Sequence, residues 1–131
     1  QLKQHIMKDS ISHLHVMCQD WIRELKFYKS EIPFFKNRLE EIVQKNTSSE
    51  ILMHVEHFEN KFRLMEIHID ELLHDVKLKD KVLLESALEK PNYIGVKMIE
   101  SDNTIAELIQ SDATDFVKTK KEFYQFLAKY L

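Results

Sequence analysis

Apolar residues recur along this chain at alternating intervals of three and four, the spacing that places side chains on one face of an α-helix. The first such seam is entirely apolar or aromatic and consists of Met7, Ile11, Leu14, Cys18, Trp21, Leu25, Tyr28, Ile32, Phe35, Leu39 and Ile42. The second seam consists of Ile51, Val55, Phe58, Phe62, Met65, Ile69, Leu72 and Val76. Uninterrupted seams of this length predict helices that pack lengthwise against one another.

A third seam contains one polar member and consists of Ile109, Ala113, Phe116, Lys120, Phe123, Leu127 and Tyr130. The polar member, Lys120, could reach solvent, pair with a carboxylate or set the register of the helices. Further apolar residues lie beside all three seams, so the apolar stripe is wider than a two-stranded coiled coil requires. This width favours a bundle of three or four helices.

Residues that interrupt helices are scarce, because the chain of 131 residues has one glycine and two prolines. Thr47 and Glu50 have capping-box spacing, and Pro91 disfavours helix at the residue before it. We therefore predict an all-α, antiparallel up-down bundle of three long helices at about residues 5–45, 48–90 and 93–131. The length fits a single domain of residues 1–131.

Two features leave details of this bundle open. Residues 101–104 could break the last segment, with Thr104 and Glu107 as a capping box, so a bundle of four helices is the alternative. Pro33 removes one helical hydrogen bond, but the first seam keeps its phase on both sides of it. This constancy predicts a kinked but continuous first helix.

Four of the seven histidines lie between His54 and His74, where Glu71 and His74 have the Glu-x-x-His spacing of di-iron helical bundles. Such a site needs the pair to point into the bundle core. The second seam instead turns Ile69 and Leu72 inward and places Glu71 and His74 on the outer face. We interpret the histidines as surface or seam-edge residues, and we predict no metal site and no cofactor.

One alternative metal site depends on how the helices pair. In an antiparallel hairpin that turns near residue 47, His15 should lie near residues 76–80, about one turn from His74. A third helix parallel to the first would bring Glu107 to a similar level. The candidate ligands are therefore His15, His74, Asp75 and Glu107, whose imidazole and carboxylate groups suit zinc or iron.

Composition and charge exclude several classes of protein. The net charge of −3 provides no basic field for nucleic acid, and no stretch approaches the ~18 consecutive apolar residues of a membrane span. Cys18 is the only cysteine, so no internal disulfide can form, which favours a reducing, cytoplasmic setting. No signal-peptide pattern opens the chain, and no phosphate-binding glycine loop or cysteine cluster occurs. We expect a protein that is not an enzyme.

The stretch LHVMCQDWIREL, residues 14–25, resembles the first helix of a spectrin-type three-helix repeat, which carries a tryptophan at a core position. Trp21 occupies that position here. The resemblance implies a bundle of three long helices. The matching tryptophan of the third helix is absent, because Trp21 is the only tryptophan, and we assign no family on this stretch.

These features predict an interaction or scaffold module that acts through contacts with a protein partner or with itself, as a homodimer. The expected partner-binding residues are apolar residues beside the seams, namely Ile22, Phe27, Phe34, Val43, Leu64 and Leu73. The alternative for these residues is that they complete the core. Two other functions stay open: a metal-binding or oxidative four-helix bundle, and a pH sensor that uses His15, His54 and His68 at the edges of the seams.

Overall fold

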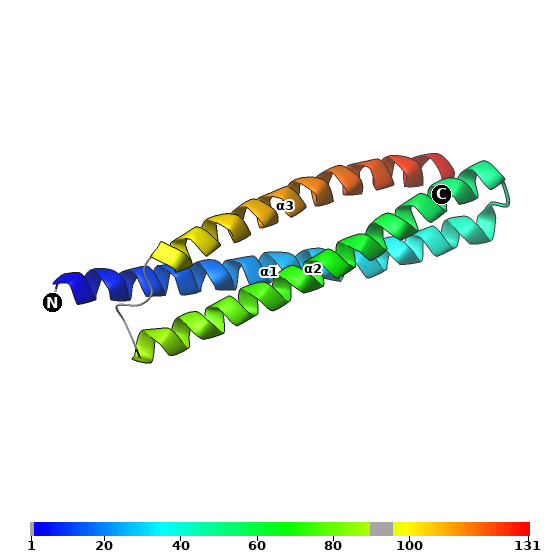
Figure 1. Cartoon of the computed structure of the whole chain (residues 1–131). Coiled ribbons are helices and arrows are strands. Elements are labelled where there is room, and N and C mark those ends of the chain that lie inside the picture. Colours follow the sequence, from blue (N-terminus) through cyan, green and yellow to red (C-terminus); the bar gives the residue numbers. More distant parts are fainter. Residues whose placement is uncertain (1, 90–95) are drawn as a thin grey trace.

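The structure, a computed structural model, describes the backbone of residues 2–89 and 96–131 and the side chains of residues 11–85 and 104–131. Its helices are α1 (Leu2–Lys45), α2 (Ser49–Glu89) and α3 (Val96–Tyr130). α2 runs back along α1, and α3 then runs in the direction of α1 (Figure 1). This arrangement confirms the predicted antiparallel up-down bundle of three long helices. None of the described helices has an apolar stretch long enough to cross a membrane.

α3 is continuous through residues 101–104, so the alternative with a fourth helix is wrong. The polar residues of this stretch have only slightly lower helix propensity than alanine, by up to about 0.7 kcal/mol each. Ile105 and Ile109 follow directly and are buried, and burial of such side chains outweighs that cost. The predicted turn at Pro91 lies outside the described residues.

Residues 46–48 connect α1 to α2, and Asn46 closes the end of α1. Its amide nitrogen Nδ2 donates to the carbonyl of Ile42 at 2.9 Å and lies 3.5 Å from the carbonyl of Tyr130. One side chain therefore satisfies free carbonyls at the C-terminal ends of two helices. The carbonyl of Ser48 accepts from the amide of Leu52 at 3.0 Å, so α2 begins one residue later than a cap at Thr47 predicts.

α1 runs through Pro33 without interruption, as the constant phase of the seam predicts. Proline has no amide hydrogen, so the carbonyl of Lys29 loses its helical donor. Ile32 and Phe35 flank the proline and are buried, with exposed fractions of 0% and 4%. Burial of the seam on both sides of Pro33 keeps the helix continuous despite the missing hydrogen bond.

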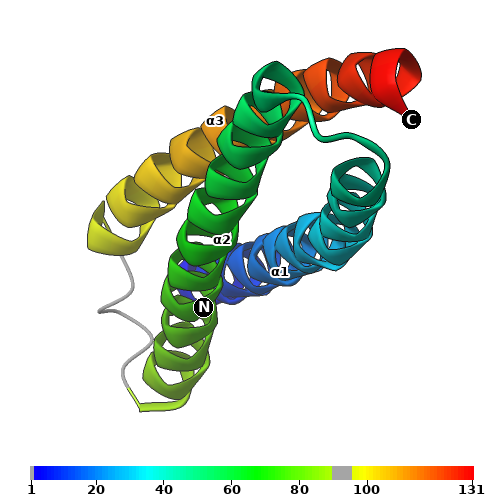
Figure 2. The same cartoon turned by 90° about the vertical axis from the view of Figure 1, so that its right-hand side faces the viewer.

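Aromatic rings separate α3 from the other two helices. α1 and α2 approach each other closely along much of their length, whereas α3 lies farther from both. Figure 2 views the bundle from the end that carries the α1–α2 connection and shows the three helices spread apart there. Phe123 fills this distance, because its ring centroid lies 5.3 Å from Phe35, 5.3 Å from Phe58 and 5.0 Å from Phe62. The position of α3 therefore depends on a few large rings.

The core confirms two of the predicted seams and corrects the third. Described members of the first two seams are buried or half-buried. On α3 the buried side is formed by Ile105, Ile109, Asp112, Phe116, Thr119, Phe123 and Phe126, with Asp112 the most open of them. The predicted members Ala113, Lys120 and Leu127 lie at its edge, each one residue from the true position. The prediction was wrong there because it preferred the apolar Ala113 to Asp112, and because Leu127 and Phe126 are both apolar and do not distinguish the two phases.

Candidate functional site

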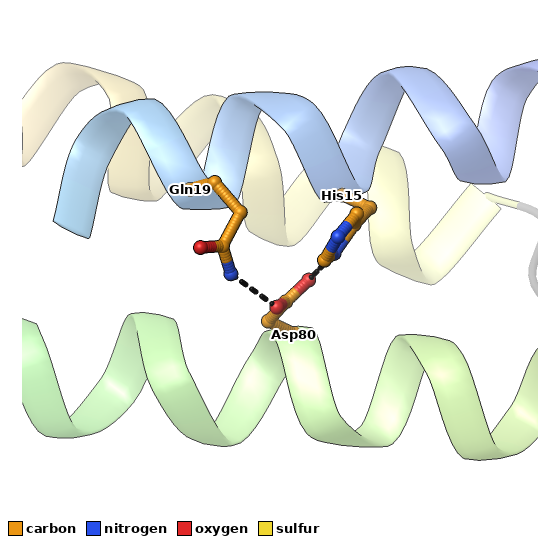
Figure 3. A network of polar contacts seen from close by, with 3 residues as sticks. All are labelled: His15, Gln19 and Asp80. Carbon is orange, nitrogen blue, oxygen red and sulfur yellow. Dashed lines mark hydrogen bonds and ion pairs between the residues drawn. The ribbon is translucent and has the colours of Figure 1, made fainter. Parts of the chain in front are cut away.

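A polar network joins α1 to α2 at the level predicted for His15 (Figure 3). Nδ1 of His15 lies 2.7 Å from Oδ1 of Asp80, and Nε2 of Gln19 donates to Oδ2 of Asp80 at 2.9 Å. Asp80 is 7% exposed, so both oxygens of a buried carboxylate are held by side chains of the facing helix. The pairing of His15 with residues 76–80 is thereby confirmed.

The candidate metal ligands are not brought together. Among residues 11–85 and 104–131, no group of three His, Cys, Asp or Glu side chains could hold an ion. His74, Asp75 and Glu107 are exposed, whereas His15 is bound to Asp80. The proposed constellation was wrong because Asp80, not His74 or Asp75, occupies the side of α2 that faces α1 at this level.

Cys18 lies in the core beside this network, and it is fully buried. Burial and the negative charge of Asp80 raise the pKa of its thiol, and the charge of Lys79 opposes them. Burial likewise lowers the pKa of Lys79, which is 8% exposed. Because the thiolate is the reactive form of cysteine, this environment disfavours nucleophilic chemistry at Cys18.

Asp80→Ala is expected to lower the free energy of unfolding by about 1–3 kcal/mol, because it leaves partly buried donors of α1 without an acceptor. The matched control is Asp70→Ala on the same pair of helices. Asp70 lies 2.6 Å from Lys29, but both side chains are about half exposed, so this change should cost no more than about 1 kcal/mol. Urea denaturation followed by circular dichroism measures both values. Equal losses would show that burial of Asp80 adds nothing.

A second polar pair joins α2 to α3. Nδ1 of His68 lies 2.9 Å from Oδ1 of Asp112, while Oδ2 of Asp112 is buried without a hydrogen-bond partner among the described residues. Burial raises the pKa of Asp112, against the opposing effect of His68. The carboxylate lies beside a cavity of about 30 Å³, which has room for one water molecule. Tyr28, His68 and Phe116 help to line this cavity.

The predicted partner-binding residues divide into two groups. Ile22 and Leu73 are 9% and 6% exposed and belong to the core, so they complete the bundle and present no surface. The prediction for these two residues is corrected, because both positions face the neighbouring helix. Val43, Leu64, Phe27 and Phe34 are exposed, and the two phenylalanines are 54% and 68% exposed.

Two residues of α3 extend the exposed surface around Phe27 and Phe34. Val117 is 65% exposed and Tyr124 is 49% exposed, and they are seven residues apart, as are Phe27 and Phe34. Residues seven apart lie on one face of a helix. We call Phe27, Phe34, Val117 and Tyr124 the aromatic strip, with one row on α1 and the other on α3.

An ion pair joins the two rows of the aromatic strip. Nζ of Lys120 donates to Oε2 of Glu31 at 2.9 Å, and this hydrogen bond raises the pKa of Lys120. Glu31 lies four residues after Phe27 and three before Phe34, spacings that share a helix face. Lys120 lies three residues after Val117 and four before Tyr124, and its Nζ lies 5.6 Å from the ring centroid of Tyr124. The four apolar side chains therefore surround one ion pair, which confirms carboxylate pairing for Lys120.

Ring contacts through the core show that the two rows lie at similar levels along the bundle. Tyr28, next to Phe27, has its ring centroid 4.5 Å from that of Phe116, next to Val117. One heptad later, Phe35 lies 6.0 Å from Tyr124. Together with the Glu31–Lys120 pair, these contacts place Phe27 within about one helical turn of the level of Val117, and Phe34 within about one turn of Tyr124.

Comparisons with known proteins find no family model that matches the chain, and no curated protein or solved structure that is significantly similar to it. Function therefore has to be argued from the surface and its chemistry.

Sequence reasoning found the α1 row of the aromatic strip and missed the α3 row. With Lys120 and Leu127 placed in the seam, Val117 and Tyr124 had no evident relation to α1. The signal that would have found them is the heptad spacing of Val117 and Tyr124 on the side of α3 next to Lys120. Asp112 was missed for the same reason, because the seam was placed one residue away.

Proposed function

We propose that this chain is a non-enzymatic helical interaction module that binds a protein partner through the aromatic strip. The observation that carries the proposal is the gathering of four large apolar side chains, each about half exposed or more, around one ion pair. An apolar surface bordered by charged residues is typical of protein–protein interfaces, where aromatic residues contribute much of the binding energy.

The extent of the strip also supports this proposal. A fully exposed aromatic side chain presents about 200 Å², so the exposed fractions of Phe27, Phe34 and Tyr124 correspond to about 340 Å². The smaller Val117 brings the apolar surface of the strip to about 400 Å². This area is in the range of the largest apolar patch on a typical monomer, about 300–600 Å², which is often functional. The alternative metal-binding or oxidative function has no comparable support, because its candidate ligands do not meet.

The test compares the tagged wild-type chain with Phe34→Glu and with the control Ile67→Glu. Ile67 is 50% exposed on α2 and lies between Glu66, which pairs with α1, and His68, which pairs with α3, so it points away from both. Proteins retained from a cell extract are identified by mass spectrometry and tested again as purified components. A second copy of the chain counts as a partner.

We expect the wild type and Ile67→Glu to bind the same purified partner, and Phe34→Glu to bind it about 30-fold more weakly. Phe34 is largely exposed, so the variant should fold, which circular dichroism checks. Equal binding by all three proteins would contradict the role of the strip. If no purified partner binds the wild type, the proposed function is wrong.

A further inference from the structure

The structure points to a second copy of this chain as the partner, docked through the aromatic strip about a two-fold axis parallel to the helices. This inference rests on the proposed function, because it names the occupant of the same surface. In such a dimer, α1 of each copy lies over α3 of the other, and both run in the same direction. The levels of the two rows, the arrangement of charge and the available area each support this arrangement.

The levels of the two rows make the strip complementary to itself. A two-fold axis parallel to the helices exchanges the two rows and leaves the level of each residue unchanged. Phe27 of one copy therefore meets Val117 of the second copy, and Phe34 meets Tyr124. These pairs are within reach because Phe27 and Val117, and Phe34 and Tyr124, lie within about one helical turn of the same level in each chain.

The central ion pair distinguishes this axis from the other two-fold axis that the surface allows. With the axis parallel to the helices, Glu31 of one copy lies over Lys120 of the second copy, so the four charges alternate in sign. With the axis perpendicular to the helices, Glu31 would lie over Glu31 and Lys120 over Lys120. Like charges brought together at an interface oppose association, so the parallel arrangement is favoured.

The area suits a dimer of moderate strength. The two strips contribute about 800 Å² of apolar surface, and the charged residues beside them add to it. The total approaches the lower end of the range for specific complexes, about 1,200–2,000 Å².

The first measurement is sedimentation velocity of the untagged chain from about 1 to 200 µM. We expect a monomer–dimer equilibrium within this range, and a dissociation constant about 30-fold higher for Phe34→Glu than for Ile67→Glu. A monomer at every concentration would overturn the inference. The proposed function would survive that result if another purified partner binds through Phe34. A dimer unaffected by Phe34→Glu would also overturn the inference, and the proposed function would again depend on another purified partner that binds through Phe34.

The second measurement fixes the axis by disulfide formation between single-cysteine variants. Cys18 can stay in place, because it is fully buried and burial raises the pKa of its thiol. Mild oxidation of mixed Phe27→Cys and Val117→Cys chains should give the mixed covalent dimer in excess of either self-linked species. Mixed Phe34→Cys and Tyr124→Cys chains should do the same.

The competing arrangement gives a different pattern. An axis perpendicular to the helices at the level of Glu31 brings Phe27 over Phe34 of the second copy, so mixed Phe27→Cys and Phe34→Cys chains would link instead. That result would overturn the parallel axis while keeping the second copy as partner. Ile67→Cys mixed with Val117→Cys is the control and should show only background linkage.

Discussion

Phe123→Ala is expected to lower the free energy of unfolding by about 3–5 kcal/mol, the largest loss that we predict for a single substitution in this chain. Phe123 is fully buried, and its ring touches those of Phe35 and Phe58 as well as Phe62. Alanine would leave a cavity at the point where three helices meet. α3 approaches the other helices mainly through such rings. The substitution should therefore weaken mainly the packing of α3 against α1 and α2.

Urea denaturation followed by circular dichroism measures this loss, and Phe34→Ala is the matched control. Phe34 is 68% exposed, so the same substitution there should change the free energy of unfolding by no more than about 0.5 kcal/mol at concentrations where the chain is monomeric. If the two variants lose the same stability, the aromatic packing described for α3 is wrong.

Asp112→Leu is expected to raise the free energy of unfolding at neutral pH by about 1–2 kcal/mol. Asp112 stands on the buried side of α3 between Ile109 and Phe116, where a bundle normally carries an apolar residue. One of its oxygens is buried without a hydrogen-bond partner among the described side chains, and His68, which contacts the other oxygen, is half exposed. Replacement of a buried charged group by an apolar side chain often stabilises a protein by about 1–4 kcal/mol. Because Asp112 is partly exposed, we expect a gain at the lower end of this range.

The gain should depend on pH in a defined direction. Burial holds the pKa of Asp112 above its ordinary value of 3.8, so ionisation of this group costs the folded state free energy. The wild-type chain regains that free energy as pH falls through the raised pKa to below 3.8, because Asp112 then binds a proton. The advantage of Asp112→Leu should therefore be largest at pH 7 and smaller near pH 3.

Asp115→Leu is the control for this second prediction. Asp115 lies one residue before Phe116, is 44% exposed and pairs with Lys61 at 3.1 Å. Its replacement removes a surface ion pair and buries little, so we expect no gain in stability at pH 7. Similar gains for both variants, or a gain for Asp112→Leu that grows towards pH 3, would contradict the account of Asp112.

Most of the fold could be predicted because the seams of α1 and α2 are uniformly apolar. A seam with no polar member has one consistent phase. That phase determines which faces of α1 and α2 pack together in the hairpin, and the level at which His15 meets Asp80. Pro33 did not mislead the prediction, since the seam continues on both sides of it. On these two helices the periodic pattern alone is enough.

α3 could not be predicted as well, because polar residues lie on its buried side. At position 112 the pattern favoured the neighbouring Ala113 over the carboxylate, and at 127 both Leu127 and Phe126 are apolar. A choice between adjacent residues rotates the predicted face of the helix. The α3 row of the aromatic strip depends on that rotation, so the candidate site required the three-dimensional packing of α3 on α1.

An odd number of antiparallel helices places Leu2 and Tyr130 towards opposite ends of the bundle (Figure 1). α1 alone spans about 65 Å, so tension applied between these ends would act along the helix axes. Neighbouring helices would then have to slide past one another, which loads ring contacts and ion pairs such as Lys36–Glu66 together rather than one after another. Tension between the two ends would therefore load the contacts between the helices in shear.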